Sequence, residues 1–238
     1  MPTVALQFLK RILLPVAILL LLMIALGLLI TKAWEHAWPF TVEDGVNRDL
    51  ADGRTGAGNG VSGFFSAVGS TPVIIAVTAV AAIILRLVLH RWREPLFLCA
   101  AVSAQAIVFF FATLVIDRKR PDVSHLDKSP PTSSFPSGHT SAAFALYAGL
   151  ALVLASVVRY TWLKALLGVL ILVPVAVAIA RLYRGMHHPS DVTASFLNGA
   201  ACVWIMARGV LDRNVPWSRA VSDRGTNRIG DVNGRTAK

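Results

Sequence analysis

Two short polar stretches of this chain carry the residue types that proteins use for proton transfer and nucleophilic attack. One reads FPSGHTSAAFALY, from Phe135 to Tyr147, and the other reads ARLYRGMHHPSDV, from Ala180 to Val192. Histidine exchanges protons near neutral pH, and a histidine whose tautomer is fixed can act as a nucleophile. Both stretches adjoin long apolar segments, so their chemistry depends on how those segments are arranged.

The first stretch has the pattern of a helix start. Pro136 cannot continue a helix, Ser137 is a favourable N-cap residue, and an apolar helical run follows. Gly138 then lies in the first turn, where free backbone N–H groups and the helix dipole favour an anion. We expect the glycine to keep side-chain bulk away from that anion and His139 to exchange a proton beside it. Taken alone, Pro-Ser-Gly-His is a weak signal, and the stretch is also compatible with an ordinary helix start.

The second stretch places a histidine and an aspartate around another helix start. Pro189 suits the first helical turn, His187 precedes it, and Asp191 follows His187 by four residues. A carboxylate bonded to one ring nitrogen would fix the tautomer and leave the other nitrogen as a nucleophile. In the alternative interpretation, Asp191 only stabilises the helix start. The role of His188 stays open.

Arginines next to these stretches indicate the kind of substrate. Arg120 precedes Pro121, and Arg181 ends an apolar run. Their guanidinium groups are fork-shaped donors that suit phosphate, and ionisable groups at membrane depth are costly enough to indicate function. Arg118 and Lys119 are further phosphate-binding candidates, although they could instead contact head groups or belong to a solvated loop.

The composition indicates which kind of structural element holds these residues in place. The 238-residue chain is 55% hydrophobic and 15% charged, against about 25% charged in soluble domains, and its mean hydropathy is +0.62. A helix needs roughly 20 apolar residues to cross a bilayer. The sequence therefore predicts an all-α, polytopic membrane protein, a bundle of about six transmembrane helices: 12–30, 73–89, 96–116, 142–158, 163–180 and 192–211. Too little polar chain remains to cover these segments in a soluble protein.

The first apolar block is too long for a cleaved secretory signal, and no small-x-small cleavage site follows it. We therefore interpret it as a retained anchor. Residues 1–211 are expected to form one six-span domain, and the polar segment 212–238 is expected to be a disordered cytoplasmic tail. The Gly-rich segment 31–72 is compatible with a helical strip that covers the site or with a flexible connector.

Basic residues are distributed unequally between the two sets of alternate loops. One set, with both termini, has fourteen basic and four acidic residues, and the other has nine of each. The positive-inside rule therefore predicts that both termini are cytoplasmic. The motif loops 117–139 and 181–191 then share the extracytoplasmic face, where they can form an active site at the helix ends. This asymmetry also explains the net charge of +10 without nucleic-acid binding.

Taken in order, these motifs resemble those of the type 2 phosphatidic acid phosphatase superfamily. They are Arg120-Pro121, Pro-Ser-Gly-His at 136–139, and an arginine at 181 followed by His187 and Asp191. The direct resemblance covers about residues 117–191, and the spacing of the apolar segments extends it to the whole chain except the tail. Six spans argue against the soluble haloperoxidases that share the motif set.

Two positions depart from the family pattern. Thr113 stands where the first motif has a lysine, and Ala180 stands where the third usually has a serine. Two interpretations stay open: Arg118 or Lys119 supplies the missing positive charge from the loop, or phosphate binding is weaker or differently shaped. The absent lysine bears more on substrate preference than on reaction class.

The resemblance implies a membrane lipid phosphatase. His187 would attack phosphorus to give a phosphohistidine, Asp191 would orient it, and His139 would serve as acid and then base. Phosphate would be held by Arg120, Ser137, Gly138 and Arg181, with Arg118 and Lys119 nearby. No cofactor or metal is expected, because arginines take the place of a cation and the histidines belong to the motifs.

The substrate classes implied by the resemblance are phosphatidate, an isoprenoid diphosphate such as undecaprenyl diphosphate, and phosphatidylglycerophosphate. The expected partners are this lipid phosphate and the bilayer, and the oligomeric state stays open. Two other functions stay open as well: phosphoryl transfer to an acceptor other than water, and lipid binding by a protein whose catalytic site has been eroded.

Overall fold

The computed structural model describes residues 2–34, 36–129 and 131–212, and among these residues it contains helices and no β-strand. The α-helices are α1 (Pro2–Phe8), α2 (Leu14–Leu28), α3 (Glu43–Asp52), α4 (Gly56–Val68), α5 (Thr71–Leu89), α6 (Arg93–Val115), α7 (Gly138–Val157), α8 (Thr161–Leu167), α9 (Leu172–Tyr183) and α10 (Pro189–Met206). Short π- or 3₁₀-helical segments extend or precede them: η1 (Leu9–Leu13), η2 (Leu29–Ala33), η3 (Phe40–Val42), η4 (Gly168–Ile171) and η5 (Ala207–Leu211).

Within the described residues, six continuous helical runs are long and apolar enough to cross a membrane. They are Val4–Ala33, Thr71–Leu89, Arg93–Val115, Gly138–Val157, Thr161–Tyr183 and Pro189–Leu211. The predicted all-α, six-span architecture is therefore confirmed. The outward faces of these runs carry exposed leucine, isoleucine and valine side chains, as expected of helices that face lipid.

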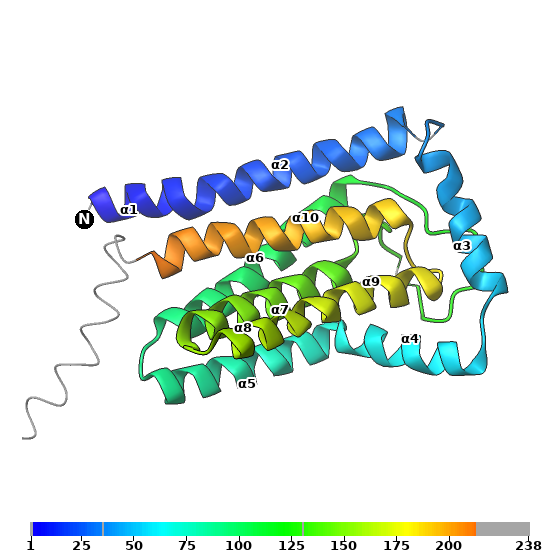
Figure 1. Cartoon of the computed structure of the whole chain (residues 1–238). Helices are drawn as coiled ribbons and strands as arrows, with labels where there is room; N and C mark the ends of the chain where they lie inside the picture. Colours follow the sequence, from blue (N-terminus) through cyan, green and yellow to red (C-terminus); the bar gives the residue numbers. More distant parts are fainter. Residues whose placement is uncertain (1, 35, 130, 213–238) are drawn as a thin grey trace, which may run out of the picture.

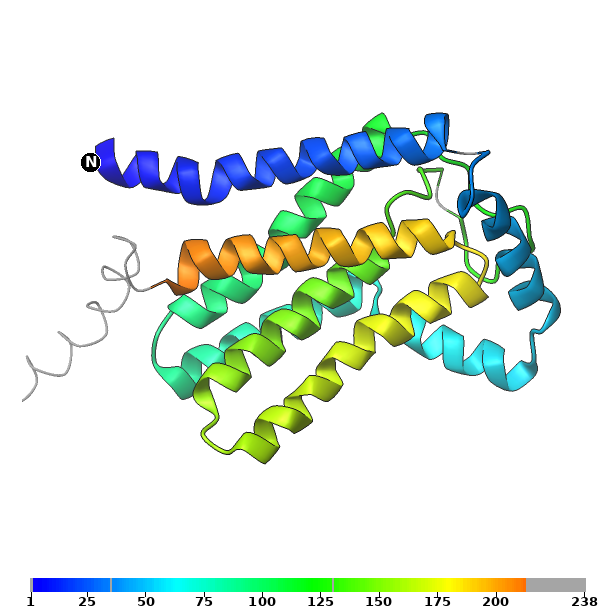
Figure 2. The same ribbon diagram turned by 45° about the horizontal axis from the view of Figure 1, so that its top comes forward.

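Three helices form the centre of the bundle. α7 packs against α6, α9 and α10, and α10 also packs against α6 and α2. The buried side chains include Phe97 and Val108 of α6 and Leu146 and Val153 of α7, all fully enclosed. The long first helix lies along the outside, beside α10 and α6 (Figures 1 and 2). The motif-bearing helices α7 and α10 are thus the most enclosed ones.

All segments that carry the motifs lie at one end of the bundle. The loop between α6 and α7, the turn between α9 and α10, and helices α3 and α4 gather there, whereas the start of α1 and the end of α10 lie at the opposite end (Figures 1 and 2). The two motif loops are therefore neighbours in space. At the opposite end Arg11 donates a hydrogen bond to Asp212, 2.7 Å away.

The segment 31–72 is largely helical. α3 and α4 run across the end of the bundle that holds the motifs, and both contact α9 (Figure 1). Arg54, in the short link between them, bonds to the carbonyl oxygens of Tyr183 and Ser124 at 2.9 and 2.8 Å. The structure therefore agrees with the interpretation of this segment as a helical strip that covers the site, and not with a connector that lacks helices.

Local signals explain where the two motif helices begin. Ser137 is the N-cap of α7, so the helix begins at Gly138, four residues before the apolar block. Pro189 is the first residue of α10, as its fixed φ angle favours. The predicted disordered tail lies, apart from Asp212, outside the described residues.

The arrangement of helix ends makes the predicted orientation testable. Thr132, in the motif loop between α6 and α7, and Arg159, in the link between α7 and α8, are both exposed. In a chain whose two native cysteines are replaced by alanine, we expect an impermeant thiol reagent to label Thr132→Cys in intact cells. Arg159→Cys should react only after the membrane is permeabilised. The reverse pattern would invalidate the orientation drawn from the positive charges.

Candidate active site

His187 lies in the turn before α10 and is almost completely buried. Its Nδ1 is 2.7 Å from the carbonyl oxygen of Ser134 and 3.8 Å from the Asp191 carboxylate. Because a carbonyl oxygen only accepts, Nδ1 carries the proton of the neutral ring and Nε2 carries the lone pair. Burial lowers the pKa of His187; Asp191 opposes this shift, and the charges of Arg181 and Arg120 add to it. The ring is held neutral in the tautomer that a nucleophile requires.

The distance between Asp191 and His187 is longer than that of the hydrogen bond expected from the sequence. The direct hydrogen-bond acceptor of the ring is the Ser134 carbonyl, a backbone group that side-chain spacing does not reveal. Asp191 is fully buried; one of its oxygens accepts from the His188 backbone N–H at 2.8 Å and the other from Arg118. Asp191 therefore stabilises the start of α10 and also places a negative charge beside the His187 ring.

Arg118 does not have the surroundings expected of a phosphate ligand. Its guanidinium group donates to Asp191 through Nη1 and to Glu43 through Nη2, the latter at 2.7 Å. Lys119 has an exposed side chain, and its carbonyl oxygen accepts from the Ser134 hydroxyl at 3.0 Å. That either residue supplies the missing charge at the phosphate stays a prediction, for which Arg118 would have to share donors that two carboxylates already engage.

Arg120 and Arg181 retain unused donors. Arg120 donates to the Met186 carbonyl at 2.7 Å and forms no ion pair with the described residues. Arg181 donates to Ser66 at 2.7 Å and to Asp127. The Nε–H group of each arginine is buried without a protein acceptor in the described part of the chain. Such donors favour an anionic ligand, since an unsatisfied buried N–H group is costly.

The start of α7 faces the same cluster. His139 is half-buried and lies within electrostatic reach of Arg181, His187, Asp127 and Arg120. Burial also lowers the pKa of Arg120, an effect opposed by Asp191. The fold thus brings the two histidines and the two arginines of the motifs together at the helix ends.

Gly138 has a packing role that its motif position does not reveal. A Cβ atom added there would lie 2.9 Å from the Phe109 ring of α6. Glycine at this position therefore allows α6 and α7 to approach each other closely, in addition to leaving the first turn of α7 free of a side chain. Ser137 is fully buried, and its hydroxyl caps α7 by accepting from the Thr140 N–H group.

Two serines outside the motif positions join the motif loops. Ser134 donates its N–H to the Arg118 carbonyl at 2.9 Å while its own carbonyl accepts from His187. On α10, Ser195 accepts the Ser137 N–H at 2.7 Å and donates to the Asp191 carbonyl at 2.6 Å. Sequence reasoning missed both, since serines are common in loops and in membrane helices and carry no distinctive spacing.

Asp127, in the loop between α6 and α7, accepts hydrogen bonds from the arginines at the end of α9 and from helix α4. Asp127 accepts from Arg181 and from Arg184, the latter at 2.7 Å, and also accepts the Ser66 hydroxyl of α4 at 3.0 Å. Burial alone would raise the pKa of Asp127, but the Arg184 hydrogen bond and the two arginine charges outweigh it and lower that pKa to about 2. Asp127 is a further residue that the sequence analysis did not identify.

Neither residue that departs from the family pattern has a charged hydrogen-bond partner in the described part of the chain. Thr113 donates to the Phe110 carbonyl of its own helix at 2.8 Å. Ala180 is buried in α9. No group of three or more histidine, cysteine, aspartate or glutamate side chains within residues 2–34, 36–129 and 131–212 is arranged to hold a metal ion.

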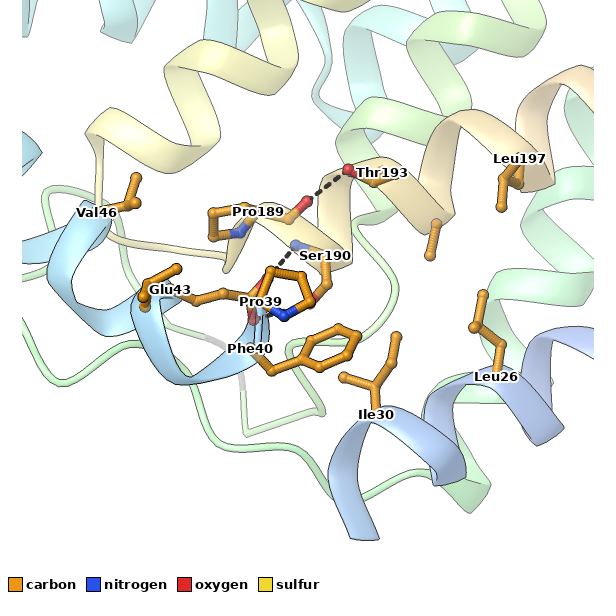
Figure 3. Close-up of a pocket in the computed structure, with 12 residues that line it drawn as sticks. Leu26, Ile30, Pro39, Phe40, Glu43, Val46, Pro189, Ser190, Thr193 and Leu197 are labelled. Carbon is orange, nitrogen blue, oxygen red and sulfur yellow. Dashed lines mark hydrogen bonds between the residues drawn. The ribbon is translucent and has the colours of Figure 1, made fainter. Parts of the chain in front are cut away.

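An apolar cavity adjoins the start of α10. It has a volume of ≈ 410 Å³, and its walls come from α2, η3, α3 and α10 (Figure 3). Leu26, Ile30, Phe40 and Leu197 line its apolar part, and Glu43 and Ser190 form its polar part. Ser190 also accepts a hydrogen bond from Arg118 at 2.7 Å, so the cavity is one hydrogen bond away from the Arg118–Asp191 pair.

Comparison with known proteins identifies the fold. The sequence model described as the PAP2 superfamily matches residues 12–214. The structure resembles a transmembrane PAP2-type phosphatidylglycerolphosphate phosphatase from Bacillus subtilis with a TM-score of 0.68 and 20% identity, covering 81% of this chain and 93% of that one. It also resembles LpxE of Aquifex aeolicus, with a TM-score of 0.57 and 24% identity over 71% and 97% of the two chains. No curated protein sequence matches the chain.

Asp127, which accepts hydrogen bonds from both Arg181 and Arg184, is expected to make a pH-dependent contribution to stability. The folded pKa of Asp127, about 2, lies below its ordinary value of 3.8, so its contribution is complete above that ordinary value and is lost as pH falls through the folded pKa. We expect Asp127→Asn to lower the free energy of unfolding at pH 6 by ~2 kcal/mol. The difference from the wild type should shrink at pH 3.

Denaturant unfolding in detergent micelles at both pH values measures this difference. The matched control is Asp122→Asn, which changes an exposed carboxylate of the same loop. Equal losses in the two variants, or a difference that does not change with pH, would contradict the assignment.

Proposed function

The chain belongs to the PAP2 superfamily and is a phosphoric ester hydrolase of the membrane, and we propose that it releases phosphate from a lipid phosphate through a phosphohistidine at His187. The observation that carries this proposal is the buried, neutral His187 ring, whose Nδ1 is engaged by the Ser134 carbonyl and whose Nε2 holds the lone pair. Beside it Arg120 is a cation with an unused buried N–H group.

The first step is attack on phosphorus. Nε2 of His187 forms a bond to phosphorus, and the bond between phosphorus and the leaving oxygen breaks. His139 gives its proton to that oxygen, which leaves as the lipid alcohol or, from a diphosphate, as the lipid monophosphate. Arg120 and Arg181 stabilise the charge on the remaining phosphoryl oxygens. The ring that results is positive, and both the Ser134 carbonyl and the Asp191 carboxylate lie beside its Nδ1–H.

The second step returns the enzyme to its starting state. His139, now neutral, takes a proton from a water molecule, whose oxygen attacks phosphorus while the bond to Nε2 breaks. Inorganic phosphate leaves, and His187 is neutral again. The lowered pKa of His187 assists this step, because a ring that resists carrying a positive charge is a good leaving group.

The location of the site supports a substrate with a hydrocarbon chain. The reacting groups lie at the ends of membrane-spanning helices, and the apolar cavity between α2, α3 and α10 begins at Ser190, next to Asp191. We propose that the substrate is one of three lipid classes: phosphatidate, phosphatidylglycerophosphate or an isoprenoid diphosphate. We also propose that the site faces away from the cytosol of a cell membrane, as the positive charges around the termini favour.

A substrate panel tests the reaction class. In detergent with excess chelator, the purified protein is expected to release phosphate from at least one of the three lipid classes faster than from p-nitrophenyl phosphate. Turnover of the soluble ester alone would contradict the lipid substrate. The absence of any release from the wild type would favour a lipid-binding protein with an eroded site, and phosphate passed to an added alcohol would indicate a phosphotransferase.

The nucleophile is tested by a variant and by trapping. His187→Ala should reduce phosphate release by at least about 10³-fold, because the covalent step is lost. The wild type quenched during turnover of a ³²P-labelled substrate should carry an acid-labile, alkali-stable label that the variant lacks. His36→Ala, which changes an exposed histidine, is the matched control and should behave like the wild type. Equal activity in His187→Ala and the wild type would remove the nucleophile assignment.

A further inference from the structure

Helix α3 buries two polar side chains on one face. Glu43 and Asn47 are four residues apart, so they lie on the same side of the helix. Their exposed fractions are 6% and 1%, whereas Asp44 and Asp49 of the same helix are exposed. Burial of a carboxylate and an amide is costly unless their polar atoms are paired, so the partners of these two residues indicate what the face does.

Glu43 binds two residues that adjoin or contact Asp191, namely Ser190 and Arg118. Its Oε1 accepts the backbone N–H of Ser190 at 2.7 Å (Figure 3). Its Oε2 accepts from the Ser190 hydroxyl at 3.0 Å and from Arg118 at 2.7 Å. Arg118 in turn donates to Asp191. A chain of charge-assisted hydrogen bonds therefore runs from α3 through Arg118 to the buried aspartate, and a second contact holds the first turn of α10.

Asn47 binds the backbone of the nucleophile itself. Its Nδ2 donates to the carbonyl oxygen of His187 at 3.0 Å, whereas its buried Oδ1 has no donor among the described residues. Together the two side chains hold the turn at its beginning, through the His187 carbonyl, and three residues later, through the Ser190 N–H. The first of these points is the carbonyl group bonded to the Cα atom that carries the His187 ring, whose direction decides whether Nε2 meets phosphorus.

A purely structural role for α3 does not require this arrangement. A helix that only covers the end of the bundle gains most from apolar residues on its inner face, since replacing buried polar pairs by apolar groups is often neutral or stabilising. Here the inner face instead presents a carboxylate and an amide to the turn that carries His187. Polar side chains placed in this way can orient a reacting residue.

We propose that Glu43 and Asn47 are positioning residues for phosphoryl transfer and that α3 clamps the His187–Asp191 turn in its reactive geometry. Glu43 acts through Arg118 and Ser190, and Asn47 acts through the His187 carbonyl. This inference rests on the function proposed above. It assigns the segment between the first two spans to the active site, although none of the recognised motifs lies there.

The test compares Glu43→Gln with the wild type. Glutamine keeps the shape of the side chain and an acceptor for the Ser190 N–H, but it removes the negative charge opposite Arg118. A misplaced nucleophile is expected to lower kcat by about 10²-fold. KM should change by no more than about two-fold, because Arg120 and Arg181 still bind the phosphoryl group. Single-turnover labelling with ³²P should show that formation of the phosphoenzyme has slowed.

A matched control and a second variant complete the test. Asp49→Asn removes an exposed carboxylate from the same helix and should leave kcat unchanged. Asn47→Ser removes the hydrogen bond to the His187 carbonyl without a change in charge, and it gives the decisive measurement if Glu43→Gln does not fold. Its kcat is likewise expected to fall while KM is retained.

The outcomes distinguish this inference from the proposed function. A wild type that releases no phosphate overturns both. If the wild type releases phosphate and folded Glu43→Gln has a kcat within about two-fold of the wild-type value, the inference alone is overturned. If Glu43→Gln does not fold, the same criterion applies to folded Asn47→Ser. A higher KM at unchanged kcat also overturns it, since that result would indicate a binding role. A lower rate of phosphoenzyme formation at unchanged KM supports the clamp.

Discussion

The carboxylate of Asp191 is completely buried, and a buried charge is stable only when its oxygens are paired. Its partners come from distant parts of the chain: Arg118 follows α6, the His188 N–H begins α10, and Glu43 of α3 shares Arg118. Satisfying this one charge therefore fixes the loop after α6, the start of α10 and the helix that covers them. The His187 ring lies within this arrangement, with its proton on Nδ1.

The arginines of the site divide into two groups by their partners. Arg118, Arg181 and Arg184 are paired with buried or half-buried carboxylates, so their positions are set before a substrate arrives. Arg120 forms no ion pair with the described residues, and the buried Nε–H groups of Arg120, Arg181 and Arg184 have no acceptor there. The protein thus supplies preorganised donors for an anion, and the acids around them limit the mutual repulsion of so many cations. This arrangement suits a phosphoryl group, whose charge is spread over several oxygens.

Much of the fold follows from short-range rules. Each apolar segment must satisfy its backbone hydrogen bonds within the helix, so six long apolar runs predict six helices. Ser137 and Pro189 mark the starts of α7 and α10 because capping and a fixed φ angle depend on adjacent residues alone. The contact between His187 and Ser134 could not be predicted in this way, because it joins residues 53 positions apart through a backbone carbonyl that every residue possesses.

By itself, the sequence determined the helical spans, the polar stretches at their ends and the residue types available for phosphoryl chemistry, since these depend on composition and local spacing. Tertiary structure alone decided how the charges are shared. It directed Arg118 to Asp191 and Glu43, left Arg120 without an ion pair among the described residues, exposed Lys119 and turned Glu43 and Asn47 inward. The physical reason is that each buried ionic group takes the partners that packing brings within hydrogen-bond distance, and packing depends on the whole chain.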